Sequence, residues 1–589
     1  MPTAVLTRSY DNGRTGANLN ETVLTPGLVA SKGLTRVRSF TLVDDDPRIE
    51  AQPLYVPRLL MPDGQRHDVL FVASMGNFIW AFDVDGHGSW KSPQLGPPYN
   101  PPQKPPPTQY GRIPTVIDSW GINGLWGILS TPVIDVDANR MYFVNWRMLP
   151  GGKRALFAGQ IDISTMQPIG NPVMLQAQAQ DQQGNPVMGP DGQPVALKPD
   201  QKQRAALLLV PLRGAGKTLF IATTGGENPG SPNGWMLALD VDSFTQTGAW
   251  VSTPSSFGGG IWQASQGPSA DTQGNVYAIT ANGGYLQGHK DHIQDFNGST
   301  DFAEAIVRLK YQKTGPGQGT LTLDDWFIPF RDSDRTTNVN GYDYRDQDLG
   351  SAAPVLPPDN NLVLGGGKDG LLYVLDRDHL GKKVADLSVL KSPPIYVTFN
   401  GVGLPTTVPN IDFPLGGAGN PKKTHHLHGS PAYWNGANGP MIFTWGENES
   451  LRAWKLDPNS GTVTFVGKGA EVASAQLAAS PQGVGGMPGG MLGVTSNGTS
   501  PNTGIVWALA PIDGDANHDV VAGIARAYDA TNLDPTPLDP WTPRLKLLWD
   551  SQSAGISFNH AKFCAPVVAD GRLFVPTYDG RVDMYMLKP

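Results

Sequence analysis

Three histidines lie almost side by side in the sequence and could ligate a metal ion. They form the run His425-His426-Leu427-His428, in a chain that contains ten histidines. Because alternate residues of an extended strand point to the same side, His426 and His428 can both present an imidazole to one ion. With His560 they would form a three-histidine site for zinc, copper or iron. The alternative is a structural role, in which the imidazoles hydrogen-bond backbone carbonyls.

Two acidic segments have the spacing with which calcium loops begin. Asp135-Val136-Asp137-Ala138-Asn139 and Asp513-Gly514-Asp515-Ala516-Asn517 both read Asp-x-Asp-x-Asn. Carboxylate and amide oxygens are calcium ligands. In the second segment, however, the EF-hand pattern requires Gly and Glu where His518 and Ile524 stand. Asp and Asn also favour tight turns without any ion, so either interpretation is open for both segments.

The chain has one cysteine, Cys564, among 589 residues. A single cysteine excludes an intrachain disulfide, a cysteine-rich zinc site and a CxxCH haem attachment. Cys564 lies inside a predicted inner strand, so we expect it to be a small buried residue and not a nucleophile.

The composition indicates many short strands joined by turns. There are 71 Gly and 53 Pro, and charged residues make up only 16%. The net charge of −8 and the lack of any Lys/Arg run argue against a nucleic-acid partner. No apolar run is long enough for a transmembrane helix. The first residues lack the pattern of a secretory signal, so we expect a cytoplasmic protein or one whose leader has been removed.

One pattern recurs along the chain and predicts a closed all-β propeller. A small residue followed by Pro precedes an apolar run, then a second strand, then a third strand that ends in Asp or a similar turn residue. Eight such starts predict eight blades, and seven is the alternative because one copy is Gly-rich. The eight starts lie at Gln52, Thr131, Ala206, Gly267, Ala353, Ser430, Met487 and Ala565.

The two ends of the chain predict how the ring closes. The last repeat stops at Pro589 directly after its third strand, whereas residues 34–43 form a strand that precedes the first repeat. If this strand completes the last blade, the ring is latched and has no open edge. Residues 1–33 would then be an N-terminal extension to one propeller domain, 34–589. Loop insertions are expected near 91–120, 172–203 and 380–424.

The repeats resemble those of quinoprotein alcohol dehydrogenases, which use pyrroloquinoline quinone (PQQ), and of their non-enzymatic relatives. The segment from Gly258-Gly259-Gly260-Ile261-Trp262 to Thr280-Ala281-Asn282-Gly283 is similar to the stretch in which a Gly-rich turn presents a tryptophan beneath the quinone. By this resemblance Trp262 is the stacking platform and Asn282 is a calcium ligand. An aromatic face suits a flat quinone, and an amide oxygen suits calcium.

A second segment carries the same resemblance. Gly367-Lys368-Asp369-Gly370 and the strand after it are similar to the family's stretch in which a basic residue contacts the quinone, here Lys368. Asp346-Gln347-Asp348 falls where the family places its catalytic aspartate, so Asp348 or Asp346 is the expected base. Glu227 lies near the position of the family's calcium-ligating glutamate.

Two functions follow from the resemblance. One is a PQQ- and calcium-dependent oxidoreductase for an alcohol, polyol or sugar. The other is a non-catalytic propeller that binds a glycan, a protein or a cell-surface component. The resemblance also implies a secreted or periplasmic location if a leader was removed. The single cysteine cannot form the vicinal cysteine pair that these dehydrogenases usually carry. In both cases we expect the ligand, a small molecule or a glycan, at one mouth of the central channel. The sequence does not determine the oligomeric state.

Overall fold

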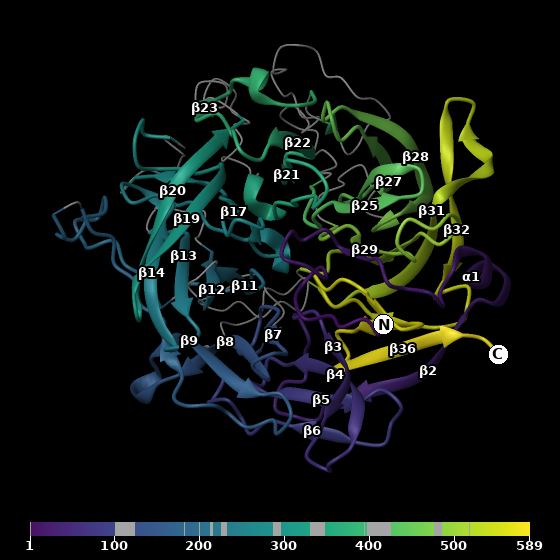
Figure 1. The fold of residues 1–589 in the computed structure, drawn as a ribbon, viewed down its shortest axis with the longest axis horizontal. Coiled ribbons are helices and arrows are strands. Elements are labelled where there is room, and N and C mark those ends of the chain that lie inside the picture. Colours follow the sequence, from purple (N-terminus) through teal and green to yellow (C-terminus); the bar gives the residue numbers. More distant parts are fainter. Residues whose placement is uncertain are drawn as a thin grey trace.

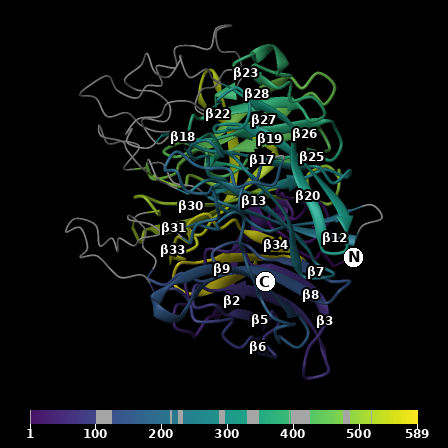
Figure 2. The same ribbon diagram turned by 90° about the vertical axis from the view of Figure 1, so that its left-hand side faces the viewer.

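Small antiparallel sheets follow one another around a central axis in the computed structural model (Figure 1). The structure describes residues 2–100, 124–181, 183–199, 201–212, 216–224, 232–286, 296–329, 348–393, 395–396, 426–475, 486–517 and 519–589. The predicted β-propeller is confirmed. Figure 2 shows the same ring from its side.

The first four groups of strands come from the N-terminal half of the chain. Each runs in chain order from an inner strand to an outer one. They are β3 (Leu54–Leu60), β4 (Arg66–Ala73), β5 (Ile79–Asp83) and β6 (Ser89–Lys91); β7 (Val133–Asp135), β8 (Arg140–Met148), β9 (Arg154–Asp162) and β10 (Val173–Met174); β11 (Leu208–Leu212), β12 (Gly216–Thr223), β13 (Trp235–Asp240) and β14 (Thr245–Val251); and β16 (Ser269–Ala270), β17 (Val276–Ile279), β19 (Ile306–Gly315) and β20 (Gln318–Ile328), with β23 (Lys383–Val384) parallel to β20.

The remaining groups follow the same order, except that the last ends with β2 from the N-terminal part of the chain, and β28 pairs parallel with β32 so that two groups join into one sheet. They are β21 (Leu362–Gly366), β22 (Leu371–Asp376) and β24 (Ile395–Tyr396), preceded by a bridge between Val355 and Leu364; β25 (Ala432–Gly436), β26 (Gly439–Thr444), β27 (Ser450–Leu456) and β28 (Val463–Val472); β29 (Met491–Thr495), β30 (Ile505–Pro511), β31 (Ala522–Asp539) and β32 (Thr542–Asp550); and β34 (Val567–Ala569), β35 (Arg572–Pro576), β36 (Arg581–Leu587) and β2 (Leu34–Thr41).

A few short elements lie outside these groups. They are β1 (Ala17–Asn18) on β29, β15 (Phe257–Gly258) with β18 (Gly283–Tyr285), β33 (Phe558–Asn559) on β31, the helix α1 (Pro26–Lys32), and the 3-10 turns Pro150–Gly152, Gln263–Ser265, Leu349–Ser351 and Leu387–Val389.

The predicted repeat starts match the strands. Each start lies just before an inner strand, the term used here for β3, β7, β11, β16, β25, β29, β34 and the short bridge at Val355. The number of blades stays a prediction, and the grouping of the described strands is consistent with eight.

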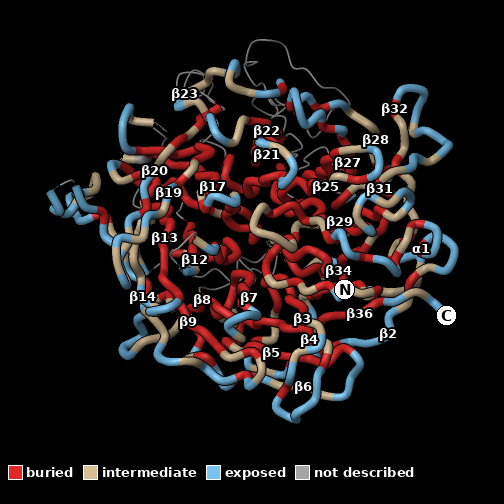
Figure 3. The backbone as a smooth tube through the Cα atoms, in the orientation of Figure 1, coloured by how far each residue is buried: buried red, intermediate tan, exposed pale blue. Residues whose placement is uncertain are grey.

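The second strand of each group is mostly buried on both faces. In β12 the run Leu219-Phe220-Ile221 is inaccessible to solvent, because Phe220 packs toward the next sheet while Leu219 and Ile221 pack toward the preceding one. Continuous apolar runs therefore replace the alternating pattern of a sheet that faces water on one side. Burial is highest near the axis, and exposed residues lie at the rim (Figure 3).

The predicted latch is present. Strand β2 pairs antiparallel with β36, from Leu34 opposite Leu587 to Thr41 opposite Arg581. Figure 1 shows the two strands side by side, although they come from opposite ends of the chain. Ser39 Oγ also donates to Asp583 Oδ1 at 2.6 Å, so the closure includes a side-chain hydrogen bond.

The residues before the latch run through the centre of the ring, where the sequence predicted only an extension. Between Val5 and Asn18 this segment hydrogen-bonds the inner part of every group of strands. The partners are Tyr55, Ile134, Leu209, Ala270, Leu356, Tyr433, Val494 and Val568, at donor–acceptor distances of 2.7–2.9 Å.

Two arginines of this central segment are fully buried. Arg14 donates to the carbonyl oxygens of Pro268, Leu207 and Arg8, each at 2.9 Å. Arg8 donates to the carbonyl oxygen of Phe563 at 2.9 Å. Burial lowers the pKa of Arg14 to about 9 and that of Arg8 to about 10. Each guanidinium thus ties the segment to residues that lie between strands in distant parts of the chain.

Among the described residues no helix has both the length and the apolar character needed to cross a lipid bilayer.

Candidate functional site

The side chains expected to do chemistry come from two kinds of segment that meet at one edge of each sheet. One is the approach segment, which we define as the residues directly before an inner strand. The other is the turn after the second strand. In an antiparallel sheet these two segments are neighbours, because the second strand ends beside the start of the first. The same backbone hydrogen bond joins them in neighbouring sheets, from Lys368 N to Asp348 O at 3.0 Å and from Glu447 N to His426 O at 2.9 Å.

Asp348 and Lys368 form a buried ion pair at this edge. Lys368 Nζ lies 2.6 Å from Asp348 Oδ2, and both side chains are at most 7% exposed. The backbone N–H of Asn282, from the neighbouring sheet, donates to Asp348 Oδ1 at 3.1 Å. Three of the residues assigned by resemblance therefore converge on one carboxylate. A buried charge pair of this kind requires close contact and further hydrogen bonds to offset its desolvation.

A glutamate that the sequence analysis missed supports this group. Glu304 is fully buried, and its Oε2 accepts a hydrogen bond from the backbone N–H of Leu349, the residue after Asp348, at 2.6 Å. The signal was a lone carboxylate in the apolar run Phe302-Ala303-Glu304-Ala305-Ile306. Acidic residues are almost never fully buried without a partner, so that position predicts a specific role.

Trp262, the expected platform, is half-buried and has a cation over its ring. Lys202 Nζ lies 5.2 Å from the ring centroid of Trp262 and 5.7 Å from that of Trp126. Contacts of this length between an ammonium and an indole are favourable cation–π interactions. Lys202 belongs to the approach segment of the third sheet, and the sequence analysis did not single it out.

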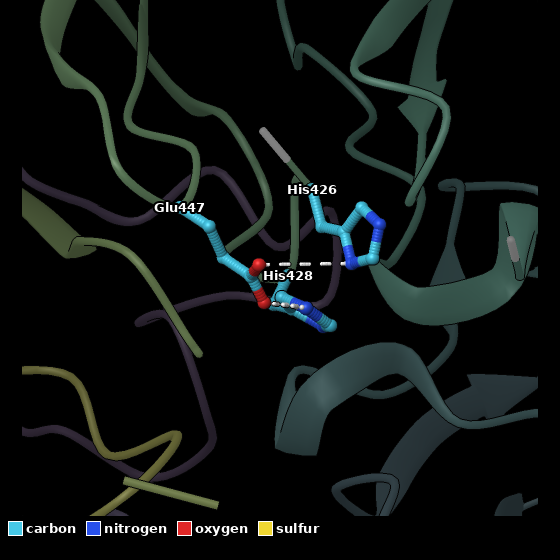
Figure 4. Close-up of side chains that lie close together, drawn as sticks. All are labelled: His426, His428 and Glu447. Atoms are coloured by element: carbon cyan, nitrogen blue, oxygen red, sulfur yellow. Dashed lines mark hydrogen bonds and ion pairs between the residues drawn. The ribbon is translucent and has the colours of Figure 1, made fainter. Parts of the chain in front are cut away.

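His426 and His428 converge on a glutamate (Figure 4). His428 Nε2 lies 2.7 Å from Glu447 Oε1, and His426 Nδ1 lies 3.7 Å from Glu447 Oε2. One ligand atom of each residue lies within 4.8 Å of the other two. The third member of the group is therefore Glu447, in the turn between β26 and β27, where the sequence analysis had expected His560.

His560 lies apart from this group. It is buried before the inner strand of the last sheet, and neither ring nitrogen has a hydrogen-bond partner among the described residues. Desolvation by burial lowers the pKa of His560 to about 3. The imidazole is neutral at physiological pH.

A further group of charged residues lies close to the residues described above. Arg204 Nη1 lies 2.8 Å from Glu50 Oε2, and Lys562 Nζ lies 3.7 Å from Glu50 Oε1. Phe563 lies between this group and the histidines, with its ring 4.8 Å from the Arg204 guanidinium carbon and 6.0 Å from the His428 ring. We call the whole set the mouth cluster. Its members are Glu50, Trp126, Lys202, Arg204, Trp262, Asn282, Asp348, Lys368, His426, His428, Glu447 and Lys562.

Several other predicted residues have a different outcome. Glu227, Asp346 and His425 lie outside the described residues. Asp135 Oδ1 accepts from Lys217 Nζ at 2.7 Å and from the N–H of Ala138 at 3.3 Å, the pattern of a tight turn. Burial raises the pKa of Cys564 to about 12, so its thiol is not ionised at neutral pH.

The mouth cluster combines the groups that proton transfer and anion binding require. It holds a carboxylate whose oxygens are fixed by an ammonium and an amide N–H, a neighbouring indole face, and a second ammonium over that face. A positioned carboxylate can accept a proton from a hydroxyl group. An ammonium attracts an anionic group, and an indole face can stack on a flat ring.

Comparisons with known proteins give the fold a context. No family model matches the chain, and no curated protein matches it in sequence. Among solved structures, a quinohemoprotein alcohol dehydrogenase from Comamonas testosteroni matches with a TM-score of 0.53 at 12% identity, covering 99% of this chain and 80% of that one. A quinohemoprotein alcohol dehydrogenase from Pseudomonas putida has a TM-score of 0.49 at 13% identity, covering 100% and 80%. BamB from Moraxella catarrhalis has 0.43 at 12%, covering 94% and 99%.

At these identities the similarity concerns the fold alone. The chain has a β-propeller fold of the kind found in quinoprotein alcohol dehydrogenases.

Proposed function

We propose that this propeller is a quinoprotein-like oxidoreductase that binds PQQ and calcium at the mouth cluster and oxidises an alcohol, a polyol or a sugar. One observation carries the proposal. Asp348, Lys368 and Asn282 come from separate segments, yet the Lys368 ammonium and the Asn282 N–H both contact the Asp348 carboxylate. This is the group that the sequence resemblance would use for base, quinone contact and calcium ligand.

The residues present fit this cofactor and its metal in kind. Asn282 supplies an amide oxygen, and calcium takes oxygen ligands of this kind. The half-buried indole of Trp262 suits a flat aromatic ring, and the nearby ammonium of Lys202 suits the negative charge of the quinone's carboxylates. When bound, the quinone would accept two electrons from the substrate carbon.

Asp348 is the group that would receive the proton of the substrate hydroxyl. Its two oxygens are oriented by Lys368 Nζ and by the N–H of Asn282, so little reorganisation is needed when the proton arrives. Glu304 fixes the backbone at Leu349 and therefore positions Asp348 indirectly. The Trp262 indole would orient the quinone. General-base catalysis of this kind contributes about 10²–10⁴-fold to a rate.

The test is reconstitution of the purified full chain with PQQ and calcium. Quinone that remains after gel filtration is measured by absorbance, and dye reduction is then measured with simple alcohols, polyols and sugars. We expect retained quinone and turnover with at least one of these substrate classes. The Asp348→Asn variant should keep its quinone but lose about 10²–10⁴-fold in turnover.

The matched control is Asp137→Asn, which removes a carboxylate that is 87% exposed in the turn between β7 and β8. This variant should behave like the unchanged protein. Absence of retained quinone at saturating calcium would overturn the proposal and favour the non-catalytic propeller. Full turnover in Asp348→Asn would overturn the assignment of the base.

A further inference from the structure

We infer that His426, His428 and Glu447, within the mouth cluster, form a binding site for a divalent transition metal that uses none of the residues proposed to hold the quinone and its calcium. The inference does not depend on PQQ or calcium. It rests on the convergence of two imidazoles and one carboxylate within a single sheet.

The site is built from two adjacent segments of one sheet. His426 and His428 lie in the approach segment before β25, and Glu447 lies in the turn between β26 and β27. The N–H of Glu447 donates to the carbonyl oxygen of His426 at 2.9 Å, which holds the two segments together. The backbone thus brings the ligands near one another before any ion binds.

The side chains complete the arrangement. Glu447 presents one carboxylate oxygen to each histidine, at 2.7 Å from His428 Nε2 and 3.7 Å from His426 Nδ1. Figure 4 shows the two rings on the same side of the carboxylate. In zinc sites the metal–ligand distances are about 2.0–2.2 Å for nitrogen and oxygen. Ligand atoms already within 4.8 Å of one another need only a small inward movement to reach one ion.

The segment that carries the histidines is also held from outside. The N–H of Leu427 donates to Gly367 O at 3.1 Å, and Ser351 Oγ donates to Leu427 O at 2.8 Å. Both the N–H and the carbonyl group of Leu427, the residue between the two histidines, are therefore hydrogen-bonded to the neighbouring sheet. A fixed backbone lowers the conformational cost of binding an ion.

The donor set selects the class of metal. Two imidazoles and one carboxylate suit zinc and non-haem iron, whereas calcium and magnesium prefer oxygen ligands alone. Three protein ligands leave at least one coordination position for water or another small molecule. His426 is the most exposed of the three, with 11% of its side chain accessible, so the open position would lie on the side of the ion next to His426.

The test uses the full chain, stripped with a chelator and free of PQQ and calcium. Co(II) is titrated while its visible d–d absorption is recorded, and Zn(II) is then added to displace it. We expect one saturable Co(II) site whose spectrum disappears with one equivalent of Zn(II). His426→Ala, His428→Ala and Glu447→Gln should each weaken Co(II) binding by about 100-fold or more.

Two control variants separate the site from its surroundings. His560→Phe removes a buried imidazole outside the group, and Glu449→Gln changes the next carboxylate, which pairs with Arg452 at 2.8 Å. Both should bind Co(II) like the unchanged protein. Absence of saturable binding in the unchanged protein would overturn the inference. Equal binding in the unchanged protein and the three ligand variants would do so too.

A second measurement covers variants that fail to fold. X-ray absorption of the unchanged protein loaded with Zn(II) should show nitrogen and oxygen ligands at about 2.0–2.2 Å with two imidazoles. A spectrum with water ligands alone would contradict the assignment. Because no quinone is present in either measurement, a failure of the metal site is distinguishable from a failure of the proposed oxidoreductase.

Discussion

The backbone N–H of Leu427 donates a hydrogen bond to the carbonyl oxygen of Gly367 at 3.1 Å. This bond joins two parts of the mouth cluster, the Asp348–Lys368 ion pair and the histidine group, because Lys368 follows Gly367 and the two histidines flank Leu427. Gly367 also packs against the backbone of Asp348 and Leu349. A Cβ atom at this position would lie 2.1 Å from Leu349 O and 2.5 Å from Asp348 O. The close approach of two backbones explains why a glycine stands here.

Gly367→Ala is expected to disturb the ion pair and the histidine group together. The new methyl group would overlap backbone atoms, which cannot rotate away, so we expect the free energy of unfolding to fall by about 1–3 kcal/mol. Co(II) affinity should fall as well, because Leu427 would lose its acceptor position. Urea unfolding and Co(II) titration measure the two effects. Gly27→Ala, with open space at its Cβ, is the control and should not destabilise the protein. An unchanged Gly367→Ala protein would refute this interpretation.

Arg14→Met is expected to weaken the centre of the ring. The substitution would leave three buried carbonyl oxygens, those of Pro268, Leu207 and Arg8, without their donor. Unsatisfied buried acceptors each cost about 1–3 kcal/mol, so we expect a total loss of about 3 kcal/mol or more in urea unfolding. Arg66→Met, at an exposed position of β4, should change stability by less than about 0.5 kcal/mol. Equal effects of the two variants would show that the central segment contributes little.

Phe40→Ala is expected to open the latch. Phe40 is buried and packs against Phe82, with ring centroids 5.4 Å apart. Loss of a buried phenylalanine costs about 3–5 kcal/mol, and limited proteolysis should then release the N-terminal strand faster. Val37→Ala changes an exposed residue of the same strand and serves as the control. Equal proteolysis of both variants would contradict a latch that depends on this packing.

His560 is expected to make the protein less stable in acid. Its pKa is about 3 in the folded protein and 6.5 in the unfolded chain, so the unfolded state binds the proton first as the pH falls. The stability is fully present above pH 6.5 and decreases below it. Between pH 6.5 and pH 5 this one group accounts for about 2 kcal/mol.

The corresponding measurement is urea unfolding of His560→Phe at pH 7 and pH 5. This variant should lose about 2 kcal/mol less than the unchanged protein over that interval, because it has no imidazole to protonate. His379→Gln, whose side chain is 85% exposed, should follow the unchanged protein. Parallel pH curves for all three proteins would contradict a buried, neutral His560.

The sequence by itself predicted the strands, the repeat starts and the latch between residues 34–43 and the last strand. The signals for these features are local, because apolar periodicity, Pro and turn residues act over a few positions. Since the sequence repeats, the strand pattern assigned to one copy also predicts the pattern of the next copy. The resemblance also brought Asp348, Lys368 and Asn282 together, since each lies at a fixed place relative to a repeat start.

Only the tertiary structure decided which side chains far apart in the sequence lie next to one another. It placed Glu447, and not His560, beside His426 and His428, because the start of an inner strand adjoins the turn after the second strand of its own sheet. It placed Lys202 over Trp262 and Glu304 beneath Leu349, contacts between residues 60 and 45 positions apart. It also ran residues 5–18 through the centre. No local pattern encodes these contacts, since they join residues that meet only when strands pair within a sheet or when separate sheets pack around one axis.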